Sequence, residues 1–96
     1  MKFLKPFIEF LGTFIALTII YYGSQRLPKH MPLIVGLAFA LVVATFQSVS
    51  SNFNPAITTM FVIAKKQPVS SLVYFIVPQL LAAFFAFEVN KYIFRV

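Results

Sequence analysis

The chain has 96 residues, of which 60% are hydrophobic and 10% charged, and its formal net charge is +6. A soluble domain of this size exposes too much surface to bury so many apolar side chains, and soluble proteins average about 25% charged residues. The cations flank apolar segments, as they do at the ends of membrane helices, and this pattern argues against nucleic-acid binding. The composition therefore predicts an integral membrane protein that crosses the bilayer several times.

Two apolar segments come first, at residues 7–23 and at residues 32–49. The first ends in two tyrosines, which favour the membrane–water interface. In the second, Gly36, Ala40 and Ala44 recur every four residues. Small residues at this spacing form a flat helix face, so we expect another helix to approach there closely.

The polar stretch "SSNFNPAITTM" follows, and it predicts a loop and a half-length helix within residues 50–66. Asn is among the best N-cap residues and Pro is favoured at the next position. We therefore expect Asn54 to cap a helix that begins with Pro55 and Ala56. About 11 helical residues would span roughly 16 Å, or half of a bilayer core of about 30 Å. Non-helical backbone at membrane depth occurs only where protein buries it or where it lines a wet cavity, so we expect a re-entrant loop at a pore or binding site.

A third apolar segment covers residues 69–89, with Pro78 expected to kink it and Ala82 and Ala86 forming another small-residue pair. The predicted fold is all-α, with three transmembrane helices and one re-entrant half-helix in a single domain, residues 1–96. The chain has no cysteine, one isolated histidine and two separated acids. These residues offer no catalytic set, so we expect no enzyme, no metal site and no cofactor.

Four segments in order resemble the aquaporin, or major intrinsic protein, family. They are "EFLGTF" (residues 9–14, including the expected packing residue Gly12), "GLAFAL" (36–41), "NPA" between "SSNF" and "ITTMF" (50–61), and "PQLLAAFFA" (78–86). A family channel contains two such repeats, inverted around one pore, whereas this chain supplies one. The resemblance implies a passive channel for water and/or small neutral solutes such as glycerol, completed by a second, inverted copy. The expected partners are membrane lipid and an antiparallel homodimer, with higher assemblies such as a tetramer of dimers left open.

The basic residues are balanced between the two ends of the predicted helices. Four lie on the N-terminal side and four on the other, a difference of 4 − 4 = 0: Lys2, Lys5, Lys65 and Lys66 against Arg26, Lys29, Lys91 and Arg95. Because Lys/Arg bias sets the orientation of membrane proteins, this balance favours insertion in both orientations.

The resemblance also indicates which residues would form the selectivity filter. Ile57 stands where a family channel has an arginine after its second Asn-Pro-Ala, and Ser51 matches a position whose carbonyl lines the filter. The second-helix filter position is either Ile34 or Phe39, and the sequence does not decide between them. We therefore expect a less polar and less discriminating constriction.

Glu9 is the one acid within the first apolar segment, where a charge is costly and usually functional. The resemblance implies a structural role for Glu9, which would accept hydrogen bonds from the Asn-Pro-Ala loop. Two alternatives stay open. One is a proton-coupled small multidrug exporter that uses Glu9, and the other is a non-conducting membrane partner subunit.

Overall fold

The structure, a computed structural model, describes residues 2–96, and among these it contains helices and turns but no strand. In chain order the elements are α1 (Leu4–Arg26), the 3-10 turn η1 (Pro28–His30), α2 (Met31–Phe46), α3 (Pro55–Ile63), α4 (Ser71–Tyr74), α5 (Ile76–Val89) and the π-helical turn η2 (Asn90–Phe94). The prediction of an all-α chain is confirmed.

Three helical segments are long and apolar enough to cross a bilayer: Leu4–Arg26, Pro28–Phe46 and Ser71–Phe94. Their lengths of 23, 19 and 24 residues correspond to roughly 28–36 Å, which matches a hydrocarbon core of about 30 Å. Most of their large apolar side chains are exposed, as in Leu33, Leu37 and Leu80, at about 60% each. The chain is therefore a multi-pass integral membrane protein.

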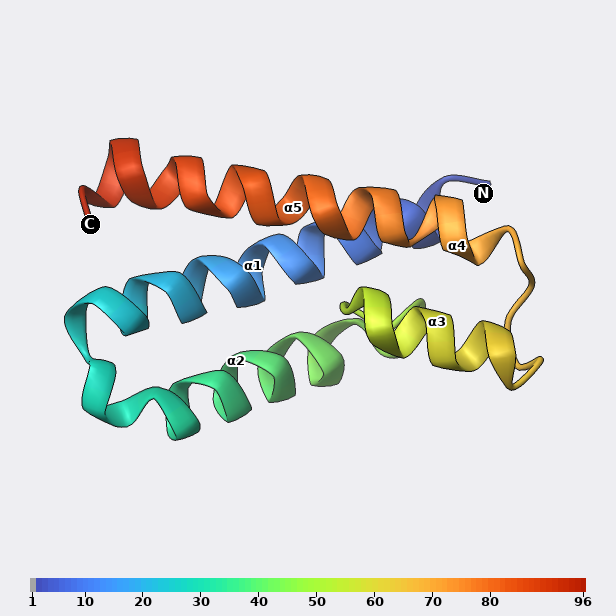
Figure 1. The fold of residues 1–96 in the computed structure, drawn as a ribbon, viewed down its shortest axis with the longest axis horizontal. Coiled ribbons are helices and arrows are strands. Elements are labelled where there is room, and N and C mark those ends of the chain that lie inside the picture. The colour runs from blue at the N-terminus through green and yellow to red at the C-terminus, as the bar shows by residue number, and fades with distance from the viewer. Residues whose placement is uncertain (1) are drawn as a thin grey trace.

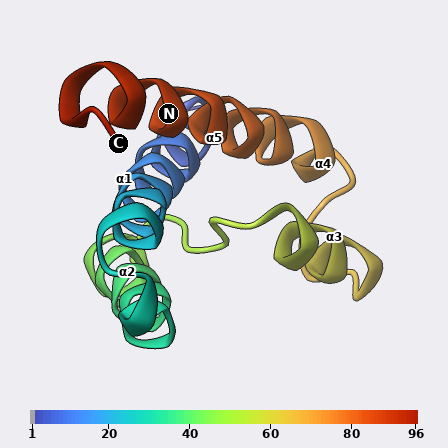
Figure 2. The ribbon, with the colours of Figure 1, turned by 60° about the vertical axis from the view of Figure 1, so that its left-hand side comes forward.

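The long segments lie side by side and alternate in direction, with the two chain ends at opposite ends of the molecule (Figure 1). Helix α1 is central, because it packs against both α2 and α5. The turned view shows α2 and α5 on different sides of α1, and a non-helical segment that leads from α2 to α3 (Figure 2). Helix α3 contacts α4 and α5, and it runs toward the end of the molecule at which α1 begins (Figure 1).

Helix α2, with 16 residues, is shorter than the predicted second segment, whereas the first and third segments are longer than predicted. Helix α2 ends at Phe46, three residues before the expected end, because residues 47–49 form a turn that starts the loop. The third segment is interrupted at Phe75, between α4 and α5. The cause is Pro78, whose missing N–H and bulky ring are incompatible with a regular bond to the carbonyl of Tyr74, four residues earlier.

The predicted small packing residues fall into two groups. Gly12, Ala82 and Ala86 are buried, and they lie on the faces of α1 and α5 that face inward. The α2 stripe of Gly36, Ala40 and Ala44 is exposed instead, and a Cβ added to Gly36 would meet nothing within 4 Å among the described residues. Helix α2 packs on α1 through its other face, which carries the buried residues Ala38 and Val42.

Candidate functional site

The loop that leads into α3 is buried, although it is polar and not helical. Ser50, Asn52 and Phe53 are each less than 9% exposed. Phe53 has φ 55°, in the left-handed region that costs a non-glycine residue about 1–3 kcal/mol. Its ring packs against Gly12, where an added Cβ would lie 2.2 Å from Phe53 Cε1, and stacks edge-on against Phe46 with the centroids 6.2 Å apart. These contacts hold the turn in a conformation that the free chain would avoid.

The carboxylate of Glu9 lies beneath this loop and is fully buried. Its oxygens accept four hydrogen bonds, from Ser50 Oγ at 2.5 Å, Asn52 N at 3.0 Å, Phe53 N at 2.7 Å and Gln79 Nε2 at 2.8 Å. Two of the donors are backbone amides of the loop, which would otherwise be unpaired inside the protein. One acid on α1 thus ties together the loop and α5.

A second layer of hydrogen bonds joins the loop to both ends of α3. Asn52 Nδ2 donates to Thr58 Oγ1 at 3.0 Å and to Gln67 Oε1 at 2.9 Å, and Gln67 Nε2 returns a bond to Asn52 Oδ1 at 3.1 Å. Gln79 Nε2 also donates to Thr58 Oγ1, at 3.0 Å. Because Thr58 is fully buried, this hydroxyl fixes the rotation of α3 about its own axis.

Helix α3 begins as the sequence predicts. Asn54 is extended (φ −157°, ψ 125°), and its Oδ1 accepts a hydrogen bond from Ala56 N at 2.8 Å. Pro55 occupies the first helical position, where its missing N–H costs nothing. The side-chain oxygen of Asn54 is occupied by this bond, whereas its Nδ2 donates to no acceptor within residues 2–96. The start of α3 therefore presents a fixed amide donor beside the positive end of the helix dipole.

Helix α3 has 9 residues, so it is roughly 14 Å long, somewhat shorter than the expected 16 Å. It ends before two lysines. Lys65 adopts the left-handed conformation (φ 61°), and the N–H groups of Lys66 and Gln67 both donate to the carbonyl of Phe61. This turn satisfies a carbonyl at the helix C-terminus.

The four filter candidates do not come together within this chain. Ile57, in the first turn of α3, is 38% exposed, and Ser51 is exposed in the loop. Ile34 lies at the other end of α2 and packs on α1, where a Cβ added to Gly23 would lie 2.8 Å from its Cδ1. Phe39 packs against the buried core cluster.

The sequence indicated Glu9 as an acceptor for the loop, and three of its four donors, Ser50, Asn52 and Phe53, do lie in that loop. It did not indicate the fourth donor or the side chains of the second layer. Asn52, Thr58, Gln67 and Gln79 are polar groups of the network that had no predicted role. Gln79 could have been found, because an amide within a predicted membrane helix must have a hydrogen-bonding partner inside the protein. The others lie in the polar loop or beside it, where their burial does not show in the sequence.

Comparison of the chain with protein-family models, with curated proteins and with solved structures found no match in any of the three.

Proposed function

We propose that the chain is one aquaporin-like repeat, a half-channel subunit that forms a passive pore for water and/or small neutral solutes such as glycerol. The observation that carries the proposal is the start of α3, where a capped nine-residue helix follows a buried loop and leaves Asn54 Nδ2 as an unused donor. In a pore, this donor would bind the oxygen of a passing water or hydroxyl. The positive end of the α3 dipole would oppose cations, including protons.

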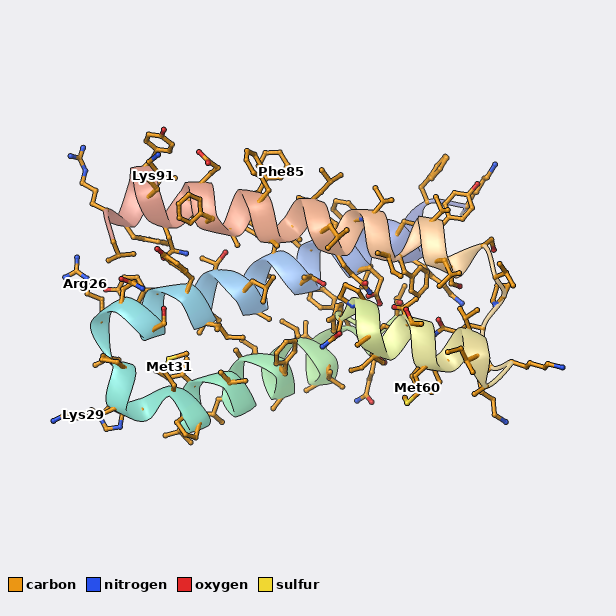
Figure 3. The ribbon with its side chains drawn as sticks, viewed as in Figure 1. Arg26, Lys29, Met31, Met60, Phe85 and Lys91 are labelled. Atoms are coloured by element: carbon orange, nitrogen blue, oxygen red, sulfur yellow. The ribbon has the colours of Figure 1, made fainter. Side chains whose placement is uncertain are left out.

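A second, inverted copy would complete the pore. The exposed surfaces of α2 and α3 favour this arrangement, because both helices carry large uncovered side chains, including Leu37, Ile57 and Met60. Met60 projects from α3 on the side away from α5 (Figure 3). Two copies related by an axis in the membrane plane would bring two α3 N-termini together near the middle of the bilayer.

The basic residues support insertion in both orientations. Arg26, Lys29 and Lys91 gather at the end of the molecule where α1 ends (Figure 3). Lys2 and Lys5 lie at the opposite end, where α1 begins, together with the two lysines that follow α3. Adding two or three lysines to one end should shift tagged chains toward a single orientation. A wild type found in one orientation only would contradict this part of the proposal.

The flux test uses the wild-type chain alone in liposomes. Stopped-flow light scattering should report rapid water or glycerol flux, while an internal pH dye reports no matching proton flux. A non-conducting subunit would show neither flux, and rapid proton leak would contradict the dipole barrier.

Cross-linking tests the antiparallel pairing directly, since the natural sequence has no cysteine. Gly36 and Ala44 lie two turns apart on the exposed face of α2. In an antiparallel pair, Gly36→Cys on one molecule should cross-link to Ala44→Cys on another. Cross-linking of Gly36→Cys only to itself would indicate parallel copies and would overturn the proposed assembly.

The exporter alternative has less support. A coupling carboxylate must exchange its proton with water or substrate, whereas Glu9 is fully buried and both of its oxygens already accept hydrogen bonds.

A further inference from the structure

The end of the molecule where α1 begins contains a pocket of about 730 Å³. Of the residues assigned to the proposed pore, only Ser51 lines it. The pocket is lined by residues from three parts of the chain: the start of α1, the loop that follows α2, and the segment between α3 and α5. This volume lies in the range of small-molecule sites, which is about 300–1,000 Å³.

The pocket is basic. Lys2, Lys5 and Lys66 line it, and no Asp or Glu is among its lining residues. Glu9 lies behind the loop, where it accepts hydrogen bonds from two lining residues, Ser50 and Asn52. The three lysine charges exceed its single negative charge. Ser51 and Ser70 line the same pocket and are exposed residues, so their hydroxyls add possible donors. Ammonium and hydroxyl donors that outnumber the one buried acid behind them favour an anionic ligand with several acceptor oxygens.

The position of the pocket narrows the class of anion. The lysines lie at helix ends, where membrane proteins meet the lipid headgroups. Leu4, Tyr74 and Phe75 also line the pocket, so it offers apolar surface beside the cations. A phosphate group with a glycerol backbone and acyl chains would match both parts.

We propose that this pocket binds the phosphate group of an anionic membrane lipid, held by Lys5 and Lys66 with Ser51 and Ser70 donating to its oxygens. Lys2 adds charge at the rim, although its ammonium also lies 5.7 Å above the ring of Phe3. The site does not depend on channel activity. In a chain that inserts both ways, it would take up such lipid from either leaflet.

Lys66 and Lys65 provide a matched pair for the test. Both are exposed lysines at the end of α3, but Lys66 lines the pocket and Lys65 does not. The full chain is titrated in neutral micelles with phosphatidylglycerol or phosphatidylcholine, and native mass spectrometry measures the lipid-bound fraction. A parallel titration with inorganic phosphate tests a soluble source of the same group. Circular dichroism checks that each variant is folded.

We expect the wild type to prefer phosphatidylglycerol, and Lys66→Gln to weaken its binding about fivefold. Lys65→Gln should change it less than twofold, and Lys66→Arg should retain it. Binding of inorganic phosphate with the same dependence on Lys66, without a preference for phosphatidylglycerol, would keep the phosphate site but assign it a soluble ligand. Equal losses in Lys66→Gln and Lys65→Gln, or no preference for either anionic probe, would overturn the proposal.

Discussion

Replacing Glu9 with glutamine tests whether this acid holds the loop in place. The carboxylate offers two acceptor oxygens, each of which takes one backbone amide, from Asn52 and from Phe53. A glutamine has one oxygen and one NH₂ group, so in either orientation one of these buried amides faces a donor. Ser50 and Gln79 can adjust, because a hydroxyl rotates and the Gln79 Oε1 has no partner among the described residues. The backbone amide cannot.

The cost follows from these contacts. One buried N–H left unpaired costs about 1–3 kcal/mol, and the remaining bonds lose their charge-assisted strength, which adds roughly 1–2 kcal/mol. We therefore expect Glu9→Gln to lower the free energy of unfolding by about 2–5 kcal/mol. Glu9→Leu, which leaves both amides unpaired, should cost more. Glu88→Gln is the matched control, since Glu88 is half-buried and substitutions away from such networks usually change stability by about 0.5 kcal/mol or less.

Unfolding of the purified protein in maltoside micelles, titrated with dodecyl sulfate and followed by circular dichroism, measures the difference. Osmotic flux through the folded fraction of Glu9→Gln should persist, because glutamine removes a support of the loop and leaves the pore lining unchanged. If Glu9→Gln unfolds at the same detergent fraction as Glu88→Gln, the reasoning from the hydrogen bonds is wrong. If it unfolds normally but abolishes proton-driven export, Glu9 is a coupling residue.

Substitutions at Gly12, Asn54 and Thr58 test the packing of the loop, the cap and amide donor of α3, and the buried hydroxyl of α3. Gly12→Ala should destabilise the fold by about 1–3 kcal/mol, because the added Cβ would overlap the ring of Phe53. Its control, Gly36→Ala, should be neutral or slightly stabilising in micelles. Equal effects of the two substitutions on detergent unfolding would contradict the packing of Phe53 against Gly12. Asn54→Ser should keep the helix cap but lower water flux, whereas Asn54→Ala should lower the flux and also lower the stability by about 1 kcal/mol. Unchanged flux in the serine variant would show that the Asn54 amide does not act in the pore. Thr58→Val should cost about 1–3 kcal/mol in the same unfolding assay, because Asn52 Nδ2 and Gln79 Nε2 each lose one of their two acceptors. Thr58→Ser should restore most of this loss; equal losses in the two variants would show that the hydroxyl is not the cause.

The local features of the fold could be predicted from the sequence because each has a local cause. Apolar length predicts the three spans, and Asn54 with Pro55 predicts the start of α3. Pro78 predicts a kink, and the structure has an interruption three residues earlier, at Phe75, because the lost bond and the clash act on the preceding turn.

The polar network could not be predicted in the same way, because its partners are far apart in the chain. Glu9 lies 41 residues before Ser50 and 70 residues before Gln79. Its partners depend on how α1, the loop and α5 pack, and no local pattern encodes that arrangement. The left-handed conformation of Phe53 is equally hidden, since residue type alone argues against it.

The contacts of α3 explain why the surface of the chain remains open on one side. Although α2 precedes α3, the buried bonds of the loop and of α3 go to Glu9 on α1 and to Gln79 on α5. These bonds fix the short helix from one side only, and they leave uncovered the first turn of α3 and the small-residue face of α2 around Ala40. A polar loop end with an unused amide donor is costly against lipid, where nothing can accept its hydrogen bond. The amide donor of Asn54 thus needs water or protein on the side that this chain does not cover. A second copy placed there would supply protein and would enclose water beside it.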